Sequence, residues 1–185
     1  MTGENQLLID RYFLLCTLTV TLKSSQIIIW NGKGVCFEMS WLKAMREKEP
    51  PEPVNPIGTV VIGTLHPEIM DTAKDMVRRS LKFAQFKTID VGKGVSPEVF
   101  ASKAKEVNAD IIVVSVLLSA AKENLPKLVS AIEHEGLKGE TVIMIGGAAV
   151  TKEDADKIGA LFGKTREEAV VLAKKAMEQK RKGSP

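Results

Sequence analysis

The chain has 185 residues, of which 44% are hydrophobic and 26% charged, and its formal net charge is +3. A chain of this length can bury one well-packed core and still carry a small additional segment. The small positive charge argues against nucleic-acid binding, because such binding requires a concentrated basic surface.

The cysteines and the first apolar run indicate the cellular setting. Cys16 and Cys36 do not form a CxxC pair, so the sequence indicates neither a disulfide framework nor a zinc site and favours the reducing cytoplasm. The run Tyr12–Leu22 is broken by three threonines and is therefore not predicted to span a membrane. The first residues carry acids rather than a basic region, so no signal peptide is predicted.

Prolines divide the chain into two parts. The stretch Lys48–Pro56, KEPPEPVNP, suits neither a helix nor the middle of a sheet. We place a linker at residues 51–57, between a small N-terminal segment (residues 1–50) and a larger domain (residues 58–180).

The N-terminal segment is predicted to be rich in β-structure. Apolar residues alternate with threonines over Cys16–Leu22, and Ile27–Trp30 and Val35–Met39 are two more short β-type runs. Asn31–Gly34 between the last two runs predicts a hairpin turn, because asparagine and glycine tolerate positive φ. A short helix is predicted over Trp41–Lys48.

Strands and helices alternate in the larger domain. Ser96 and Thr165 precede acids that suit a helix start, and Gly136 suits a helix end. The alternation predicts an α/β fold, a doubly wound parallel sheet with right-handed crossovers. The predicted strands are Thr59–Gly63, Lys87–Val91, Ile111–Ser115 and Thr141–Ile145, and the predicted helices are Glu68–Gln85, Pro97–Asn108, Lys122–Glu135, a turn after Thr151, and Thr165–Lys180.

Three loops at the carboxyl ends of predicted strands carry unusual residues. They are Leu65–Glu68, Ser115–Ser119 with two hydroxyls, and Gly146–Ala149 with almost no side chains. In a parallel sheet such loops line a crevice where ligands bind, and small residues let a ligand approach the backbone. A Gly-Gly pair after a strand is also an ordinary turn, but the three loops together predict a binding crevice.

Several motifs occur in a familiar order. Ser115-x-Leu117 is followed by Gly146-Gly147, and Asp90-Val91-Gly92, Ser96-Pro97-Glu98 and Ala155–Ala160 accompany them. With these motifs, Gly58–Lys175 resembles the Rossmann-like or flavodoxin-like cobalamin-binding domain of the corrinoid proteins that carry methyl groups in methyltransferase systems.

The resemblance implies a cofactor, a partner and a set of binding residues. The cofactor would be cobalamin or another corrinoid, and its cobalt would carry the methyl group. The partners would be methyltransferase proteins, with this chain as a carrier subunit rather than an independent catalyst. In that family a serine meets the base of the cofactor's nucleotide tail, which implies this role for Ser115. Leu117, Gly146 and Gly147 would line the tail pocket.

The family's DxHxxG motif has changed in this chain. Aligned on Asp71 and Lys74, the family's aspartate falls on Glu68, its cobalt-binding histidine on Met70 and its glycine on Ala73. A thioether is a weak donor without a second ring nitrogen for a carboxylate to orient. The resemblance thus implies corrinoid binding without the usual histidine ligand. Leu161–Gly163 also departs from the family's usual Asp-Gly-Tyr run.

Each candidate residue has an ordinary alternative. Met70 either packs in the core or the helix, or faces cobalt without strong coordination. His66 is either an exposed loop residue or a substitute ligand or proton carrier. Ser115 and Ser119 either contact a ligand or cap the following helix, and Glu68 is equally explained as a first-turn acid. His134, between two glutamates, is expected at the surface.

The leading interpretation is a corrinoid-binding methyl-group carrier that lacks the usual histidine ligand. The alternative is a degenerate relative that binds no corrinoid and serves as a regulatory or partner-binding module. The sequence shows neither a nucleophile–base pair nor a phosphate-binding GxxxxGK loop, so an independent catalytic centre is not predicted.

Overall fold

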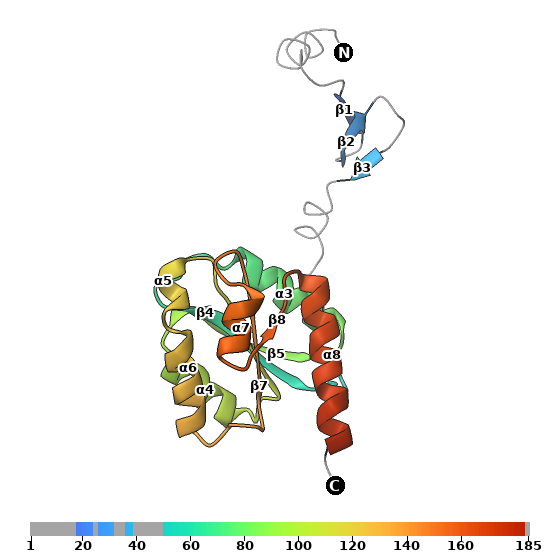
Figure 1. The fold of residues 1–185 in the computed structure, drawn as a ribbon. Coiled ribbons are helices and arrows are strands. Elements are labelled where there is room, and N and C mark those ends of the chain that lie inside the picture. The colour runs from blue at the N-terminus through green and yellow to red at the C-terminus, as the bar shows by residue number, and fades with distance from the viewer. Residues whose placement is uncertain (1–17, 24–25, 32–35, 39–49, 184–185) are drawn as a thin grey trace. The chain divides into compact units, whose positions relative to one another are not determined.

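The structure is a computed structural model, and it describes residues 18–23, 26–31, 36–38 and 50–183. The chain divides into two compact units, Met1–Lys48 and Glu49–Pro185, and each is described by itself. Figure 1 shows the elements of both units in chain order. The predicted helix Trp41–Lys48 lies outside the described residues.

The N-terminal unit contains three antiparallel strands. These are β1 (Leu18–Lys23), β2 (Gln26–Asn31) and β3 (Cys36–Glu38), in the order β1-β2-β3. The pairing of β2 with β3 matches the predicted hairpin, although most of its turn lies outside the described residues. Where the structure describes the three predicted β-type runs, they lie in these strands.

The larger unit is built on a parallel sheet of five strands in the order β5-β4-β6-β7-β8. All four strand pairs are parallel, so the predicted doubly wound sheet is confirmed. Each of the strands β4, β5, β6 and β7 is followed by one or two helices before the next strand, as parallel pairing requires. The strands are β4 (Thr59–Leu65), β5 (Lys87–Val95), β6 (Ile111–Ser115), β7 (Val142–Gly146) and β8 (Leu161–Phe162).

Helices cover both faces of this sheet (Figure 1). Helices α4 to α7 pack on one face, and α3 and α8 pack on the other. In the part of the chain that the structure describes, no helix is long and apolar enough to cross a membrane. The helices are α3 (Thr72–Phe83), α4 (Pro97–Glu106), α5 (Ser119–Lys122), α6 (Leu125–His134), α7 (Lys152–Lys157) and α8 (Arg166–Gly183).

The central strand β4 shows why the sheet is stable. Val60 and Ile62 point to the core under α3 and α8, whereas Val61 and Leu65 point to the core under α4 and α6. All four side chains are fully buried. Each contributes about 1.5–3 kcal/mol relative to an exposed side chain.

Two predicted helices differ from those observed. The first begins at Thr72 rather than Glu68, because the Glu68 carboxylate accepts a hydrogen bond from the Met70 backbone N–H and holds the intervening residues in a loop. The second begins at Leu125 rather than Lys122, with Pro126 in its first turn, and Lys122 instead ends the short helix α5.

Candidate functional site

The loops that follow β4, β6 and β7 converge at the carboxyl edge of the sheet, as predicted. These strands are neighbours in the order β4-β6-β7. The Val116 N–H donates to the Gly146 carbonyl at 2.8 Å, and the Ala149 N–H donates to the Val116 carbonyl at 3.2 Å. Backbone hydrogen bonds thus join the second loop to the third.

The Glu68 side chain joins the first loop to the second. Its Oε2 accepts hydrogen bonds from the backbone N–H groups of Leu117 at 2.9 Å and Leu118 at 2.8 Å, and its Oε1 accepts from Met70 N–H at 3.1 Å. Only 1% of Glu68 is exposed. Burial raises the pKa of its carboxyl, but the backbone N–H donors outweigh burial and hold that pKa below its ordinary value.

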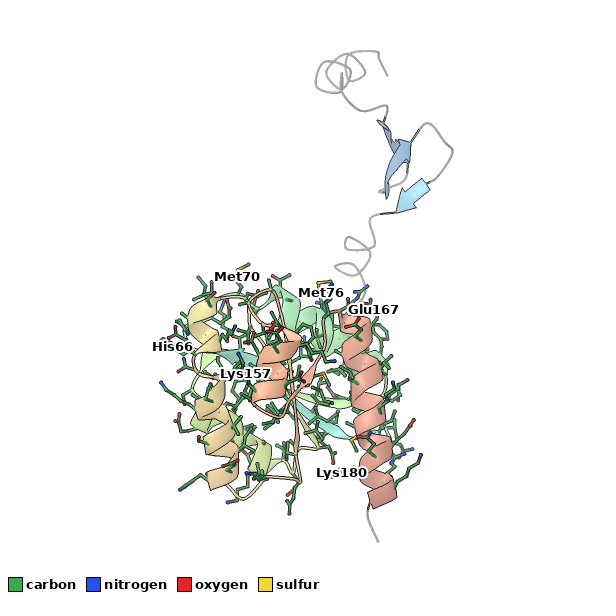
Figure 2. The ribbon with its side chains drawn as sticks, in the orientation of Figure 1. His66, Met70, Met76, Lys157, Glu167 and Lys180 are labelled. Atoms are coloured by element: carbon green, nitrogen blue, oxygen red, sulfur yellow. The ribbon has the colours of Figure 1, made fainter. Side chains whose placement is uncertain are left out.

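Apolar side chains stand exposed beside this buried carboxylate. Ile69 is 74% exposed, Met70 52% and Leu118 38%, and Figure 2 shows Met70 at the edge of the molecule. We call Ile69, Met70 and Leu118 the apolar rim. Met70 does not pack in the core, so the core-packing alternative for this residue is wrong.

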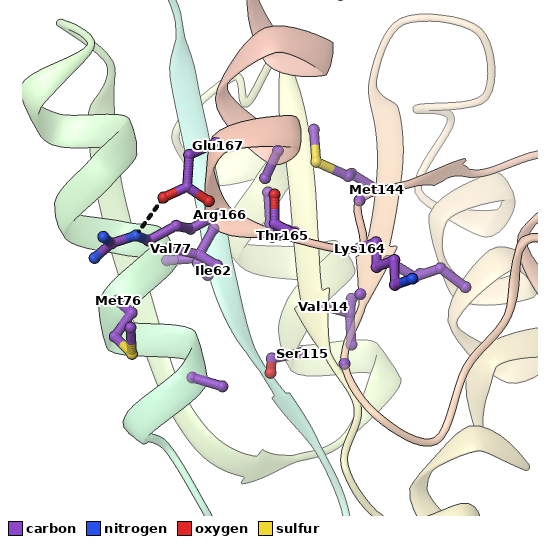
Figure 3. A pocket seen from close by; sticks show the side chains of 17 residues that line it. Ile62, Met76, Val77, Val114, Ser115, Met144, Lys164, Thr165, Arg166 and Glu167 are labelled. Atoms are coloured by element: carbon purple, nitrogen blue, oxygen red, sulfur yellow. Dashed lines mark hydrogen bonds and ion pairs between the residues drawn. The ribbon is translucent and has the colours of Figure 1, made fainter. Parts of the chain in front are cut away.

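An open pocket lies between the sheet and the helices α3 and α8. Its volume is about 330 Å³. Figure 3 shows the Ser115 side chain and those of Met76 and Val77 on its walls. The strands and α3 supply Ile62, Ala73, Met76, Val77, Val113, Val114, Ser115, Met144, Ile145 and Gly146, and the later segments supply Gly147, Gly163, Lys164, Thr165, Arg166, Glu167 and Ala169.

The pocket brings together four of the seven predicted binding residues, Ala73, Ser115, Gly146 and Gly147. Glu68, Met70 and Leu117 lie in the adjoining loops and do not line it. The Ala73 methyl forms part of a wall without closing the space. An open space is therefore present beside four of the residues that the resemblance assigns to the nucleotide tail.

Comparison with known proteins identifies the family. A model of the B12 binding domain matches residues 58–173, which is more than half of the chain. The chain belongs to the B12-binding domain family. A solved structure of a cobalamin-binding protein from Desulfitobacterium hafniense DCB-2 has the same fold, with a TM-score of 0.62 and 26% identity over 64% of this chain and 58% of that one.

Curated relatives of this B12-binding domain are corrinoid proteins of methanogens. Trimethylamine corrinoid protein 2 of Methanosarcina acetivorans is 37% identical over 66% of this chain and 57% of its own length. The dimethylamine corrinoid protein of Methanosarcina barkeri is 36% identical over 65% and 57%, respectively. The chain thus spans a little over half the length of these relatives.

The two glycines of the B12-binding domain's third loop are required by close backbone packing. A Cβ added to Gly146 would lie 2.5 Å from the Gly163 carbonyl oxygen, and one added to Gly147 would lie 2.2 Å from the Val116 carbonyl oxygen. The φ of Gly147 is +119°, which side chains rarely adopt. Glycine here keeps the loop close to its neighbours and leaves the pocket open.

Ser115 places a hydroxyl group on the pocket wall (Figure 3). The residue is 7% exposed, and its side chain makes no hydrogen bond to any other residue that the structure describes. Neither Ser115 nor Ser119 caps α5, whose N-cap is Leu118 without a side-chain cap. The capping alternative is therefore wrong, and the Ser115 hydroxyl is available to a ligand.

The C-terminal segment contributes to the pocket, which no pattern in the sequence predicts. Lys164, Thr165, Arg166 and Glu167 line it, and Arg166 Nε lies 2.7 Å from Glu167 Oε1 (Figure 3). The sequence predicts Thr165 only as a helix start, and its hydroxyl does accept a hydrogen bond from the Glu168 N–H. Only the packing of α8 beside α3 brings these residues to the site.

Neither histidine of this B12-binding domain belongs to a metal-binding cluster. His66 is exposed in the first loop, and His134 is exposed at the end of α6, as predicted. Among the described residues, no group of three or more histidine, cysteine, aspartate or glutamate side chains could hold a metal ion. The residues present fit the tail of a corrinoid, but they supply no imidazole at position 70.

Proposed function

We propose that this chain binds a corrinoid and serves as a methyl-group carrier for methyltransferase partner proteins. The observation that carries this proposal is the open pocket at the carboxyl edge of the sheet, lined by Ser115, Gly146 and Gly147. Membership of the B12-binding domain family supports it. So do the printed names of the relatives, which are corrinoid proteins.

The pocket suits the nucleotide tail of a corrinoid. The strand and α3 walls are apolar except for the hydroxyl of Ser115, so they would bury a flat aromatic base and offer it one hydrogen-bonding group. Lys164 and Arg166 would meet the more polar part of the tail. Binding of this kind places a large ligand by many contacts rather than by one strong bond.

The lower face of the corrinoid would meet the apolar rim instead of an imidazole. When bound, the corrinoid supplies the chemistry, because its cobalt accepts and yields a methyl group. Ile69 and Met70 would exclude water from that face, and Met70 would provide at most a weak sulfur donor. The protein therefore acts by binding and orienting its cofactor, as a carrier subunit. We place it in the cytoplasm, where its two cysteines would remain reduced.

Equilibrium dialysis tests the proposal directly. The full chain is dialysed against cobalamin and against cobinamide, which lacks the nucleotide tail. Cobalamin is expected to bind at least about a hundredfold more tightly, because only its tail fills the pocket. Ala73→Phe, which fills the pocket, should weaken cobalamin binding and leave cobinamide binding unchanged.

A matched substitution controls for general damage. Val171 is 50% exposed on α8 and does not line the pocket, so Val171→Phe should leave cobalamin binding unchanged. If the unaltered chain retains no corrinoid of any kind, the carrier proposal fails. The alternative, a regulatory or partner-binding module without a corrinoid, would then take its place.

A further inference from the structure

The buried carboxylate of Glu68 connects parts of the chain that are far apart in sequence. Its Oε2 bridges the N–H groups of Leu117 and Leu118, at 2.9 and 2.8 Å, across 49 and 50 residues. These two amides begin the short segment that leads into α5. They lack partners within that helix, so a carboxylate is well suited to accept from them.

The loop that carries Glu68 is also fixed at its beginning. The His66 N–H donates to the Val95 carbonyl at 3.0 Å, and Asn124 Nδ2 donates to the His66 carbonyl at 2.7 Å. The Glu68 N–H donates to the Leu65 carbonyl at 2.8 Å. Hydrogen bonds thus hold the backbone that precedes Glu68, and the Leu117 and Leu118 amides hold the Glu68 side chain. Met70 is therefore directed outward at the apolar rim.

The hydrogen bonds of Glu68 leave little capacity for another donor. A carboxylate offers about four acceptor positions. Oε2 uses two for Leu117 and Leu118, and Oε1 accepts from Met70 N–H while the Ile69 N–H also stabilises the charge. The residue is only 1% exposed, so a further donor cannot approach from solvent.

This arrangement matters because a metal-binding imidazole needs a partner for its second nitrogen. A carboxylate that accepts this N–H fixes the ring and raises its affinity for the metal. Glu68 is the acid nearest in sequence to position 70 that could serve, apart from Asp71, which lies 3.7 Å from Lys93 Nζ. The carboxylate of Glu68 is already used to hold two loops together.

We propose that Glu68 is a positioning residue that clamps the β4–α3 loop to the β6–α5 loop and thereby withholds its carboxylate from any imidazole at position 70. Two residues, Glu68 and Met70, together keep the lower face of the site free of a strong ligand. The inference about the cobalt ligand rests on the proposed function, whereas the hydrogen-bonded clamp is a property of the chain alone.

Amide hydrogen exchange tests the clamp without a corrinoid. In the unaltered chain, the Leu117 and Leu118 amides should be protected. Glu68→Ala should speed their exchange by about tenfold or more, because hydrogen bonds to a buried charge are lost. Glu68→Gln keeps the shape and one acceptor oxygen, so its effect should be intermediate, and it serves if Glu68→Ala does not fold. Glu178→Ala, at an exposed acid on α8, is the control and should change nothing at these amides.

A pair of substitutions tests the consequence for cobalt. Electron paramagnetic resonance of the bound cobalt(II) corrinoid detects a coordinated imidazole by nitrogen splitting. Met70→His alone should give little of the split signal. The double variant Glu68→Asp/Met70→His should increase the histidine-bound fraction by about tenfold or more. An aspartate is about 1.5 Å shorter, so it cannot reach the Leu117 and Leu118 amides and is free to orient the ring.

The two measurements separate the possible failures. Unchanged exchange at Leu117 and Leu118 in both Glu68→Ala and Glu68→Gln would overturn the clamp. Equal nitrogen splitting in Met70→His and in the double variant would overturn the claim that Glu68 withholds its carboxylate. Absence of corrinoid binding in every variant would instead overturn the proposed function. Hydrogen exchange would still show whether Glu68 protects the Leu117 and Leu118 amides.

Discussion

The ammonium group of Lys74 forms an ion pair with the carboxylate of Asp90, although the Lys74 side chain is only 5% exposed. This pair ties α3, a wall of the pocket, to the edge strand β5. Asp75 Oδ1 lies 3.1 Å from the same ammonium group. Burial lowers the pKa of Lys74, but its bonds to Asp90 and Asp75 outweigh burial and raise that pKa above its ordinary value.

Asp90→Asn should lower the free energy of unfolding by about 1–3 kcal/mol, because it leaves a buried ammonium group with one acid instead of two. Lys74→Met should be milder, since an apolar chain of similar length suits the buried space. Urea unfolding at pH 7 measures both. Lys138→Met, which breaks the exposed pair with Glu133, is the control and should change stability by less than about 1 kcal/mol. Equal losses in Asp90→Asn and Lys138→Met would contradict the importance of burial.

The architecture was predictable because its signals are local. Ile111–Val114 is a short apolar run between the polar residues Asp110 and Ser115, and the predicted strand Ile111–Ser115 forms β6 with these bounds. The repeated alternation of strands and helices is compatible with a parallel sheet and with few other topologies. The convergence of the three loops then followed from the fold itself, since the strands before them are neighbours.

The details of the site depend on contacts that sequence order does not contain. An acid such as Glu68, followed by a helix, is typical of a first helical turn. Its inward orientation depends on the two free amides at Leu117 and Leu118, about fifty residues later. The contribution of Lys164 and Arg166 to the pocket likewise depends on the packing of α8, which no local pattern specifies. The resemblance implied that Leu117 lines the tail pocket, whereas the structure uses its backbone N–H.

Gly147→Ala should destabilise the chain strongly. The added Cβ would lie 2.2 Å from the Val116 carbonyl oxygen, at a φ of +119°, so we expect a loss of about 3 kcal/mol or more. Gly136→Ala separates the steric clash from backbone strain, because Gly136 has a φ of +78° and nothing within 4 Å of an added Cβ. It should cost only about 1–2 kcal/mol. Similar losses in the two variants, measured by urea unfolding, would rule out a clash at Gly147.

The composition of the pocket predicts which corrinoids bind best. The strand and α3 walls offer apolar side chains such as Val77 and Met144, with Ser115 as their polar group. A corrinoid with a benzimidazole base should therefore bind about tenfold more tightly than one with adenine, whose amino group would be buried without a full set of partners. Competitive dialysis measures this ratio. Equal affinities would show that the walls do not select the base.

The stability of the chain should depend on pH through Asp154. The Lys122 ammonium group, 2.8 Å from its Oδ2, and the Thr151 backbone N–H lower the pKa of Asp154 from 3.8 to about 2. A lowered pKa in the folded state means that the stabilising contribution is complete above pH 3.8 and is lost as the pH falls toward 2. The difference in unfolding free energy between the unaltered chain and Asp154→Asn should thus be constant from pH 5 to pH 7 and should shrink below about pH 4. Lys122→Met removes the largest cause of the shift, so in that background the same comparison should depend on pH much less. A difference that stays constant down to pH 2.5 would show that the Asp154 carboxylate does not stabilise the contact between α5 and α7.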